Sequence, residues 1–291
     1  MIEFSGIWVP MVTPFLNGQV DLAAAARLAK HLAEQGADGL VVCGTTGESA
    51  TLSTSEQHQL LAAVLTAVSK DFPVAFGISG NNTAEVAQAA AALNNMPIAA
   101  LLVSAPYYVR PSQSGILQHF EAIAAASHHP LIIYNIPYRT GVTIEPATIK
   151  ALSLNPQFVA IKESGGGQIE PIYQIINETP LKFLSGEDHL IFISSCMGGH
   201  GAIAAAAHIR PDLYKKMLSY IQEGNLAAAR IIDLQLRPLI KLLFSEPNPA
   251  VIKAALAMQG LIHDELRLPM TSASAETKSK LSMLLAEINA I

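Results

Sequence analysis

The chain has 291 residues, a formal net charge of −5, 14% charged residues and 51% hydrophobic residues. This apolar content excludes an intrinsically disordered chain, and a total of two cysteines excludes a disulfide scaffold. No basic run is present to neutralise phosphates, which argues against a nucleic-acid partner, and the small charged fraction favours an oligomer.

The sequence predicts a cytoplasmic protein with no membrane partner. Residues 1–14 lack the positively charged start of a signal peptide and contain Pro10 and Pro14. Two long uncharged stretches, 86–109 and 189–209, are interrupted by prolines, glycines or polar side chains, so neither is expected to span a membrane. Both cysteines lie in apolar stretches, which is consistent with a reducing compartment.

Short apolar runs alternate with longer segments of helical spacing along the first 210 residues. Eight runs are predicted as strands, at 9–12, 40–42, 74–76, 99–103, 131–134, 158–161, 183–184 and 202–204. The helices predicted between them are 21–35, 55–68, 83–93, 112–127 and 168–177, several of which begin at a Ser, Thr or Asp. A doubly wound open sheet is the alternative, but eight such units in about 200 residues favour a closed (β/α)8 TIM barrel of the α/β class.

The chain beyond residue 210 shows no further strand pattern. Four helices are predicted there, at 212–222, 226–243, 250–259 and 275–288. The last three would form a C-terminal helical appendage. We therefore predict a barrel over residues 1–224 and a C-terminal helical domain over residues 225–291.

The carboxyl ends of barrel strands carry the active site of TIM-barrel enzymes, so the residues that follow each run are candidates. They are Thr45, Thr46, Asn81, Tyr107, Tyr108, Tyr134, Arg139, Lys162 and Gly186. Lys162 directly follows the run FVAI, whereas most other lysines fall on polar helix faces and Lys241 and Lys253 lie in apolar helices. A buried lysine has a lowered pKa, so its neutral amine can attack a carbonyl and form a Schiff base.

Tyr134 ends the strand before Lys162, so its phenol is a candidate proton carrier, with the hydroxyls of Thr45 and Tyr108 as relays. In the stretch GTTGE, amides of Thr45 and Thr46 could face a carboxylate. A strand-end lysine can equally be solvated, a strand-end tyrosine can be a packing residue, and Arg139 can form a surface salt bridge. No metal-ligand spacing and no nucleotide-binding motif is present.

Seven motifs in order resemble a known family, and they cover nearly the whole chain. They are GTTGES at 44–49, APYYVRPSQ at 105–113, YNIPYRTG at 134–141, IKES at 161–164, SGED at 185–188, GGHG at 198–201 and EPNP at 246–249. The chain resembles the class I pyruvate lyases of the dihydrodipicolinate synthase and N-acetylneuraminate lyase family. The paired Thr45 and Thr46, with Arg139, are most similar to the branch that condenses pyruvate with L-aspartate 4-semialdehyde to 4-hydroxy-tetrahydrodipicolinate, on the route to lysine and diaminopimelate.

This resemblance implies roles for individual residues. Lys162 would form a covalent imine with pyruvate, with no other cofactor and no metal, and Tyr134 would shuttle protons through Thr45 to Tyr108 of an adjacent subunit. A dimer is then the functional minimum, and a homotetramer built from two dimers is usual in the family. Further substrate contacts are implied for Thr46, Arg139, Gly186 and Ile203.

The resemblance also implies a possible lysine-regulatory site at an interface. Its matching residues are Ser49, Ala50, Asn81, Glu85 and Tyr107, whereas Thr54 and Gln57 stand where lysine-inhibited members have histidines. Other departures from the family pattern are Tyr138, Val109 and the segment SGGG at 164–167. These departures bear on the identity of the aldehyde partner.

Three alternatives stay open. The first is a sibling lyase acting on a keto-deoxy sugar acid or N-acetylneuraminate, which would keep Lys162 and Tyr134. The second is a pyridoxal phosphate enzyme in which Lys162 holds the cofactor and Gly165 to Gly167 cradle its phosphate. The third is a non-catalytic barrel that senses pyruvate or lysine.

Overall fold

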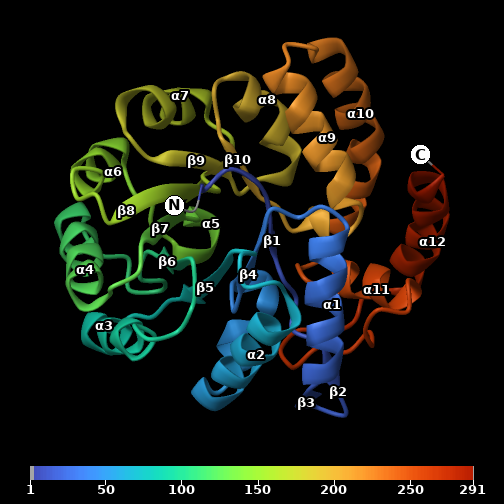
Figure 1. Cartoon of the computed structure of the whole chain (residues 1–291), viewed down its shortest axis with the longest axis horizontal. Helices are drawn as coiled ribbons and strands as arrows, with labels where there is room; N and C mark the ends of the chain where they lie inside the picture. Colours follow the sequence, from blue (N-terminus) through green and yellow to red (C-terminus); the bar gives the residue numbers. More distant parts are fainter. Residues whose placement is uncertain (1–2, 291) are drawn as a thin grey trace. The chain divides into compact units, whose positions relative to one another are not determined.

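Eight parallel strands close into a barrel in the computed structural model, which describes residues 3–290 (Figure 1). The strand order around the barrel is β1-β10-β9-β8-β7-β6-β5-β4. The strands are β1 (Gly6–Pro10), β4 (Gly39–Val42), β5 (Val74–Ile78), β6 (Ala100–Ser104), β7 (Leu131–Asn135), β8 (Phe158–Glu163), β9 (Lys182–Ser185) and β10 (Gly201–Ile203). This architecture confirms the predicted TIM barrel.

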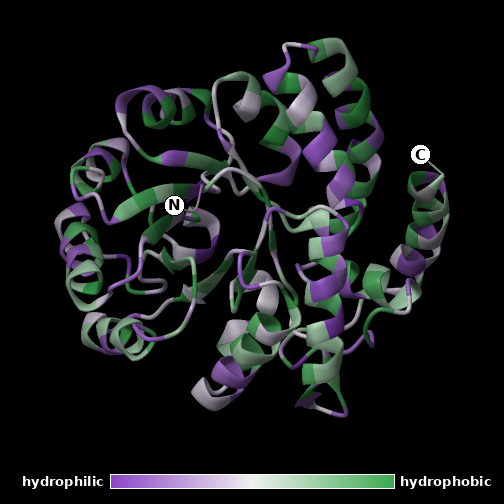
Figure 2. Cartoon of the chain, viewed as in Figure 1, coloured by the Kyte–Doolittle hydropathy of each residue, from purple (hydrophilic) through white to green (hydrophobic). Residues whose placement is uncertain are grey.

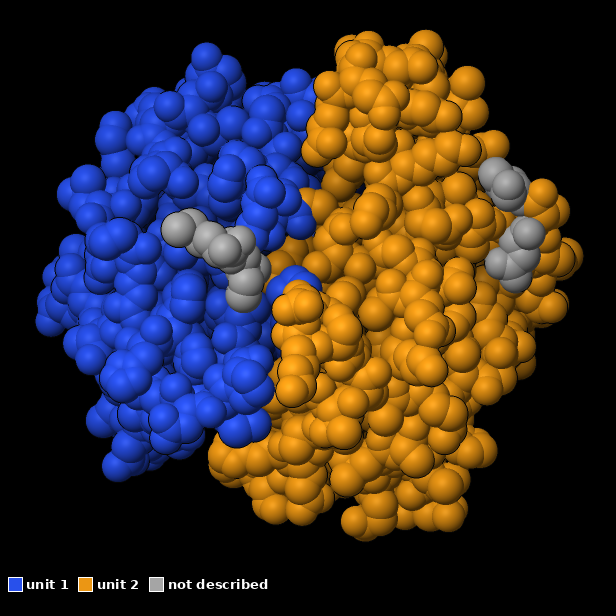
Figure 3. All heavy atoms as spheres, in the orientation of Figure 1, with its two compact units in different colours: residues 1–5, 73–203 blue, residues 6–72, 204–291 orange. Residues whose placement is uncertain are grey.

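By compactness the chain divides into two units, coloured separately in Figure 3. Unit 1 comprises residues 1–5 and 73–203, and unit 2 comprises residues 6–72 and 204–291. Each unit is a part of the chain that packs mainly against itself. This grouping does not test the predicted division at residues 224 and 225, which stays a prediction.

Unit 1 contains β5 to β10 and the helices that follow these strands. The helices are α3 (Thr83–Ala92), α4 (Gln113–Ala126), α5 (Pro137–Thr140), α6 (Pro146–Leu152), α7 (Ile169–Glu178) and α8 (Ile191–Cys196). Every residue of β6 and β7 is buried, as expected for parallel strands covered on both faces. Along α4 the buried residues Ile116, His119, Phe120 and Ile123 are spaced by helical turns, so one face of this helix packs and the other meets water. Figure 2 shows both hydrophobic and hydrophilic residues on this helix.

Unit 2 contains β1, β4, an antiparallel pair of short strands and the C-terminal helices. The short strands are β2 (Phe15–Leu16) and β3 (Gln19–Val20), and the helices are α1 (Leu22–Glu34), α2 (Thr54–Ala67), α9 (Pro211–Gln222), α10 (Leu226–Leu243), α11 (Ala250–Met258) and α12 (Ala275–Asn289). Helix α2 begins with a capping box in which the Ser53 hydroxyl accepts from the Glu56 amide and the Glu56 carboxylate accepts from the Ser53 amide. Reciprocal capping satisfies amides that lack partners in the first turn.

The sequence misplaces a few elements. The first strand was predicted at 9–12 but lies at Gly6–Pro10, because the Val12 amide leaves the sheet to donate to His208 Nε2 at 3.1 Å. The β2–β3 pair and the helices α5, α6 and α8 were not predicted. Helices α5 and α6 each begin at a proline, and proline suits the first turn of a helix because it lacks an amide hydrogen.

Candidate active site

Strand register brings Lys162 and Tyr134 together within unit 1. The two residues are paired in the β7–β8 register, and Lys162 Nζ lies 4.3 Å from the centroid of the Tyr134 ring. Both side chains are nearly buried, with exposed fractions of 5% and 6%. Lys162 was expected to follow its strand, but β8 continues to Glu163, so the lysine is held by the sheet itself.

Burial changes the acid–base chemistry of Lys162. Removal of its ammonium from water lowers the pKa to about 8, an effect that Asp188 and Glu187 partly oppose and Arg139 slightly reinforces. An appreciable fraction of the amine is therefore neutral near neutral pH. A neutral primary amine beside a phenol can attack a carbonyl carbon and exchange protons with its neighbour.

Gly186 and Arg139 lie in the same unit. A Cβ on Gly186 would lie 3.0 Å from Lys162 Cε and would collide with the Ser164 hydroxyl, so only glycine lets the backbone approach the lysine this closely. Arg139 lies in α5, where its guanidinium carbon is 5.6 Å from the centroid of the exposed Tyr138 ring. Ile203, the last residue of β10, is buried.

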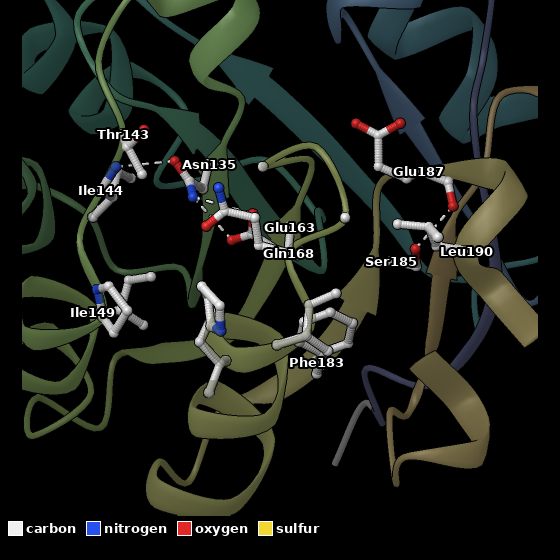
Figure 4. A pocket seen from close by; sticks show the side chains of 16 residues that line it. Asn135, Thr143, Ile144, Ile149, Glu163, Gln168, Phe183, Ser185, Glu187 and Leu190 are labelled. Carbon is white, nitrogen blue, oxygen red and sulfur yellow. Dashed lines mark hydrogen bonds between the residues drawn. The ribbon is translucent and has the colours of Figure 1, made fainter. Parts of the chain in front are cut away.

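A cavity of about 160 Å³ in unit 1 is lined by residues of β7, β8 and β9, of α6 and α7 and of the loops beside them, and Figure 4 labels ten of these residues. Within it the Asn135 amide donates to both oxygens of the Glu163 carboxylate, at 3.1 and 3.0 Å, while Asn135 Oδ1 accepts from the Ile144 amide at 3.0 Å (Figure 4). Burial raises the pKa of Glu163 to about 7, against the opposing effect of these bonds and of the Gly165 amide. The pair ties together the ends of the strands that carry Tyr134 and Lys162.

The unusual segment SGGG has a steric explanation at Gly165. A Cβ at this position would collide with the Glu163 carboxylate, so the carboxylate and the glycine backbone pack directly against each other. Gly166 and Gly167 have φ of 82° and 80°, which is the left-handed region that glycine adopts most readily. This departure from the family pattern is therefore accommodated around Glu163.

Tyr107 and Tyr108 lie in the loop after β6 and have exposed fractions of 42% and 88%. Tyr108 has φ of 70°, a conformation that costs energy for an aromatic residue. The strained backbone therefore presents the large aromatic ring of Tyr108 to solvent.

Thr45 and Thr46 belong to unit 2, in a pair of short 3-10 helices, η1 (Thr45–Gly47) and η2 (Ser49–Thr51). Thr46 is buried and its hydroxyl accepts a hydrogen bond from Asn248 Nδ2 at 2.9 Å, whereas Thr45 is partly exposed. The Thr13 hydroxyl donates to the Gly47 carbonyl at 2.6 Å. The turn at Thr45–Gly47 is thus fixed by side-chain hydrogen bonds from Thr13 and Asn248.

The five residues predicted for lysine regulation are distributed over both units. Ser49 and Ala50 lie in η2 of unit 2, and the remaining three, Asn81, Glu85 and Tyr107, lie in unit 1. The Gln57 amide donates to the Ser49 carbonyl at 3.2 Å, so this replacement for a histidine is bonded to the backbone of the predicted site. The regulatory role itself stays a prediction.

Several residues with strong interactions were not assigned a role from the sequence. Glu187 and Asp188 follow β9 and act on the charge of Lys162, so the strand-end rule that selected Gly186 applies to them as well. Asn135 and Glu163 also stand at strand ends. Lys253 was noticed only as a lysine in an apolar helix, which is a signal for a buried ion pair.

The described residues contain no group of three or more His, Cys, Asp or Glu side chains arranged to hold a metal ion. Among residues 3–290, no helix has the length and apolar character needed to cross a membrane.

Comparison with known proteins gives consistent matches along the whole chain. The model of the Dihydrodipicolinate synthetase family matches residues 3–288. The chain is 41% identical over 293 residues to the 4-hydroxy-tetrahydrodipicolinate synthase of Cyanothece sp., with 99% of each chain covered. Among solved structures it is similar to the DHDPS of Cyanidioschyzon merolae with lysine bound, with a TM-score of 0.95, 35% identity and coverage of 99% of each chain. It is also similar to the chloride-inhibited dihydrodipicolinate synthase of Acinetobacter baumannii complexed with pyruvate, with a TM-score of 0.95, 32% identity, and coverage of 99% of this chain and 100% of that chain.

Proposed function

Because the chain belongs to the Dihydrodipicolinate synthetase family, we propose that it is a Schiff-base lyase that condenses pyruvate with L-aspartate 4-semialdehyde to 4-hydroxy-tetrahydrodipicolinate. The observation that carries this proposal is the buried Lys162 amine, 4.3 Å from the Tyr134 ring, with its pKa lowered to about 8. The relatives that bear the synthase name, matched over 99% of this chain, favour this reaction over a sugar-acid lyase or a non-catalytic sensor.

In the proposed mechanism the neutral Lys162 amine attacks the keto carbon of pyruvate and water leaves, which produces an imine. Loss of a proton from the pyruvate methyl carbon converts the imine into an enamine. The enamine carbon then attacks the aldehyde and forms the new carbon–carbon bond. The amine of the second substrate displaces Lys162 from the imine carbon, so the ring closes and the free lysine is regenerated. No cofactor beyond this covalent imine is required.

Tyr134 is the proposed proton carrier for these steps. Its ring is adjacent to Lys162 Nζ, and a phenol can donate a proton to the leaving water and accept one from the attacking amine. We assign Thr45 and Tyr108 as the relay that exchanges these protons with solvent. The exposed, strained Tyr108 supports a role at a neighbouring subunit, and hence a homo-oligomer, with a tetramer built from two dimers as the proposed assembly.

Carboxylate recognition is divided between two groups of residues. The Thr45 and Thr46 amides are assigned to the pyruvate carboxylate, with Gly186 and the Ile203 carbonyl as further lining groups. Arg139 is assigned to the carboxylate of the semialdehyde, because a guanidinium can form two parallel hydrogen bonds to it. The negative charge of Glu187, which acts on Lys162 in the same unit, can attract the ammonium group of the second substrate.

Two further properties belong to the proposal. The structural relative with lysine bound supports feedback by lysine through Ser49, Ala50, Asn81, Glu85 and Tyr107. Inhibition in an L-lysine titration up to millimolar concentrations is the expected result. A cytoplasmic location is part of the proposal.

The test is a coupled assay with pyruvate, aspartate semialdehyde, excess dihydrodipicolinate reductase and NADPH, with Lys162→Ala as the matched inactive variant. NADPH consumption by the parent protein and none by the variant is the expected outcome. A parent protein that traps pyruvate with borohydride but gives no turnover would reject the aldehyde partner, and Tyr138 would be the first residue to change. A protein that traps no pyruvate would reject the lyase mechanism.

A further inference from the structure

Three side chains from the C-terminal region contact one short segment of unit 2, residues 45–51, which contains η1 and η2. We call Asn248, Lys253 and Arg267 the C-terminal clamp. Asn248 Nδ2 donates to the Thr46 hydroxyl at 2.9 Å, Lys253 Nζ donates to Glu48 Oε1 at 2.7 Å, and Arg267 Nη1 donates to the Thr51 carbonyl at 2.8 Å. The segment is therefore held near both ends and at its centre by residues about 200 positions away in the sequence.

The central contact is unusually costly for a structural link. The side chains of Lys253 and Glu48 are 0% and 2% exposed, and removing two charges from water offsets much of their mutual attraction. Lys253 Nζ also lies 4.3 Å from the centroid of the Phe15 ring, and the Arg267 amide donates to the second Glu48 oxygen at 3.2 Å. The carboxylate is thus fixed on both oxygens.

The backbone conformation of Glu48 is a second source of unfavourable free energy. Glu48 has φ of 52° and ψ of 35°, in the left-handed region that is unfavourable for a residue with a side chain. This single residue ends η1 and precedes η2, so its conformation sets the angle between the threonine turn and the segment that contains Ser49. The ion pair with Lys253 holds the side chain of the strained residue in place.

The buried side chain of Asn248 is a third source of unfavourable free energy. Its Oδ1 is buried and has no hydrogen-bond partner among the described residues, while its Nδ2 donates to Thr46. A buried oxygen without a hydrogen-bond partner lowers the stability of the fold. The buried Asn248 side chain is therefore better explained by its orientation of the Thr46 hydroxyl than by a contribution to stability. Since Thr46 accepts this bond, its own hydroxyl hydrogen remains available for another acceptor.

We propose that the C-terminal clamp presets the 45–51 segment in the conformation that binds the carboxylate of pyruvate, so that Asn248 and Lys253 are positioning residues for the first substrate. This inference rests on the proposed function, because it takes pyruvate as the ligand of Thr45 and Thr46. Three unfavourable features occur at this segment: the strained backbone of Glu48, the buried Lys253–Glu48 ion pair and the Asn248 oxygen that has no hydrogen-bond partner among the described residues. Such costs persist where a local geometry is required for function.

The test measures pyruvate binding without the second substrate. Protein is incubated with increasing pyruvate, reduced with borohydride, and the fraction modified at Lys162 is measured by intact-mass spectrometry. For Asn248→Ala we expect the pyruvate concentration at half-saturation to rise about tenfold, which corresponds to the loss of roughly one hydrogen bond's contribution. The matched control is Lys278→Met, which removes the Lys278–Asp264 ion pair in the same C-terminal region and is expected to leave half-saturation unchanged.

A second arm separates positioning from stability. Lys253→Met is compared with the double variant Lys253→Met/Glu48→Gln, in which no buried charge is left unpaired. We expect the double variant to recover most of the lost thermal stability while half-saturation stays about tenfold above the parent value. In steady-state kinetics the same variants should raise KM for pyruvate with little change in kcat, as expected for lost ground-state binding.

The outcomes distinguish this inference from the proposed function. If the parent protein traps no pyruvate, the proposed function fails. If the parent traps pyruvate and Asn248→Ala has the parent half-saturation, the inference for Asn248 is overturned. A double variant that recovers both stability and pyruvate affinity would leave the Lys253–Glu48 pair with a purely structural role. If Lys253→Met does not fold, the Asn248→Ala arm and the double variant still decide the outcome.

Discussion

Lys162 and Lys253 are both buried, and each ammonium nitrogen lies 4.3 Å from the centroid of an aromatic ring, Tyr134 in one case and Phe15 in the other. Burial lowers the pKa of both lysines. The two sites differ in their carboxylates. Lys253 donates directly to Glu48 at 2.7 Å, whereas the charges of Asp188 and Glu187 act on the pKa of Lys162.

The difference between these sites shows what converts a buried lysine into a nucleophile. A direct hydrogen bond to a buried carboxylate holds the proton on Lys253 and engages its nitrogen. The charges of Asp188 and Glu187 oppose the fall in the pKa of Lys162, which burial causes. The aromatic neighbours differ as well, because Tyr134 carries a hydroxyl that can transfer a proton and Phe15 does not.

Substitution of Lys162 is expected to have the largest effect. Lys162→Met should reduce turnover at least about a thousandfold, because the residue that forms the covalent bond is lost. Its free energy of unfolding should rise, because the lowered pKa of Lys162 shows that the buried ammonium destabilises the fold near neutral pH, and the substitution removes this desolvation cost. The coupled assay and a urea titration measure the two effects. Retained turnover would assign the imine to another lysine.

The same substitution at Lys253 should act mainly on stability. Lys253→Met leaves the Glu48 carboxylate buried without its cation, which is expected to lower the free energy of unfolding by about 3–5 kcal/mol. Denaturant titration gives this value. A loss below about 1 kcal/mol would mean that the pair contributes no more than an exposed ion pair, and the contrast between the two lysines would then disappear.

Tyr134→Phe gives the Lys162 site the same kind of aromatic neighbour that Lys253 has. The ring remains, but the hydroxyl that carries protons is removed, so kcat should fall about a hundredfold. Imine formation should slow while the thermal midpoint changes little. Measurement of kcat and of borohydride trapping under matched conditions checks this. An unchanged kcat would exclude Tyr134 as the proton carrier.

The smallest expected effect is a shift in pH dependence. Because the pKa of Lys162 is about 8, the initial rate of pyruvate trapping should increase about tenfold per pH unit below that value and level off above it. In Glu187→Gln a carboxylate that favours the ammonium is removed, so the midpoint should move to lower pH. Glu121→Gln, which removes an exposed carboxylate of α4 that is not among the charges acting on Lys162, is the matched control. A shift to higher pH would contradict the electrostatic role of Glu187.

The amino-acid sequence by itself determined the alternating strands and helices, because hydrophobic periodicity and capping residues act over a few neighbouring positions. It also identified Lys162, Tyr134 and Gly186, since each stands at or near the end of an apolar run, and strand ends share one face of a barrel. The first strand was displaced because a bond between Val12 and His208, 196 residues apart, ends the strand early.

Tertiary structure alone decided the protonation and the neighbours of these residues. In the sequence, Lys162 and Lys253 both stand in apolar surroundings. Only tertiary packing brings the Glu48 carboxylate against Lys253 and the Tyr134 ring beside Lys162. The Asn135–Glu163 pair and the C-terminal clamp likewise join residues 28 and about 200 positions apart. A pKa depends on burial and on nearby charges in space, and neither quantity is encoded in the local sequence pattern.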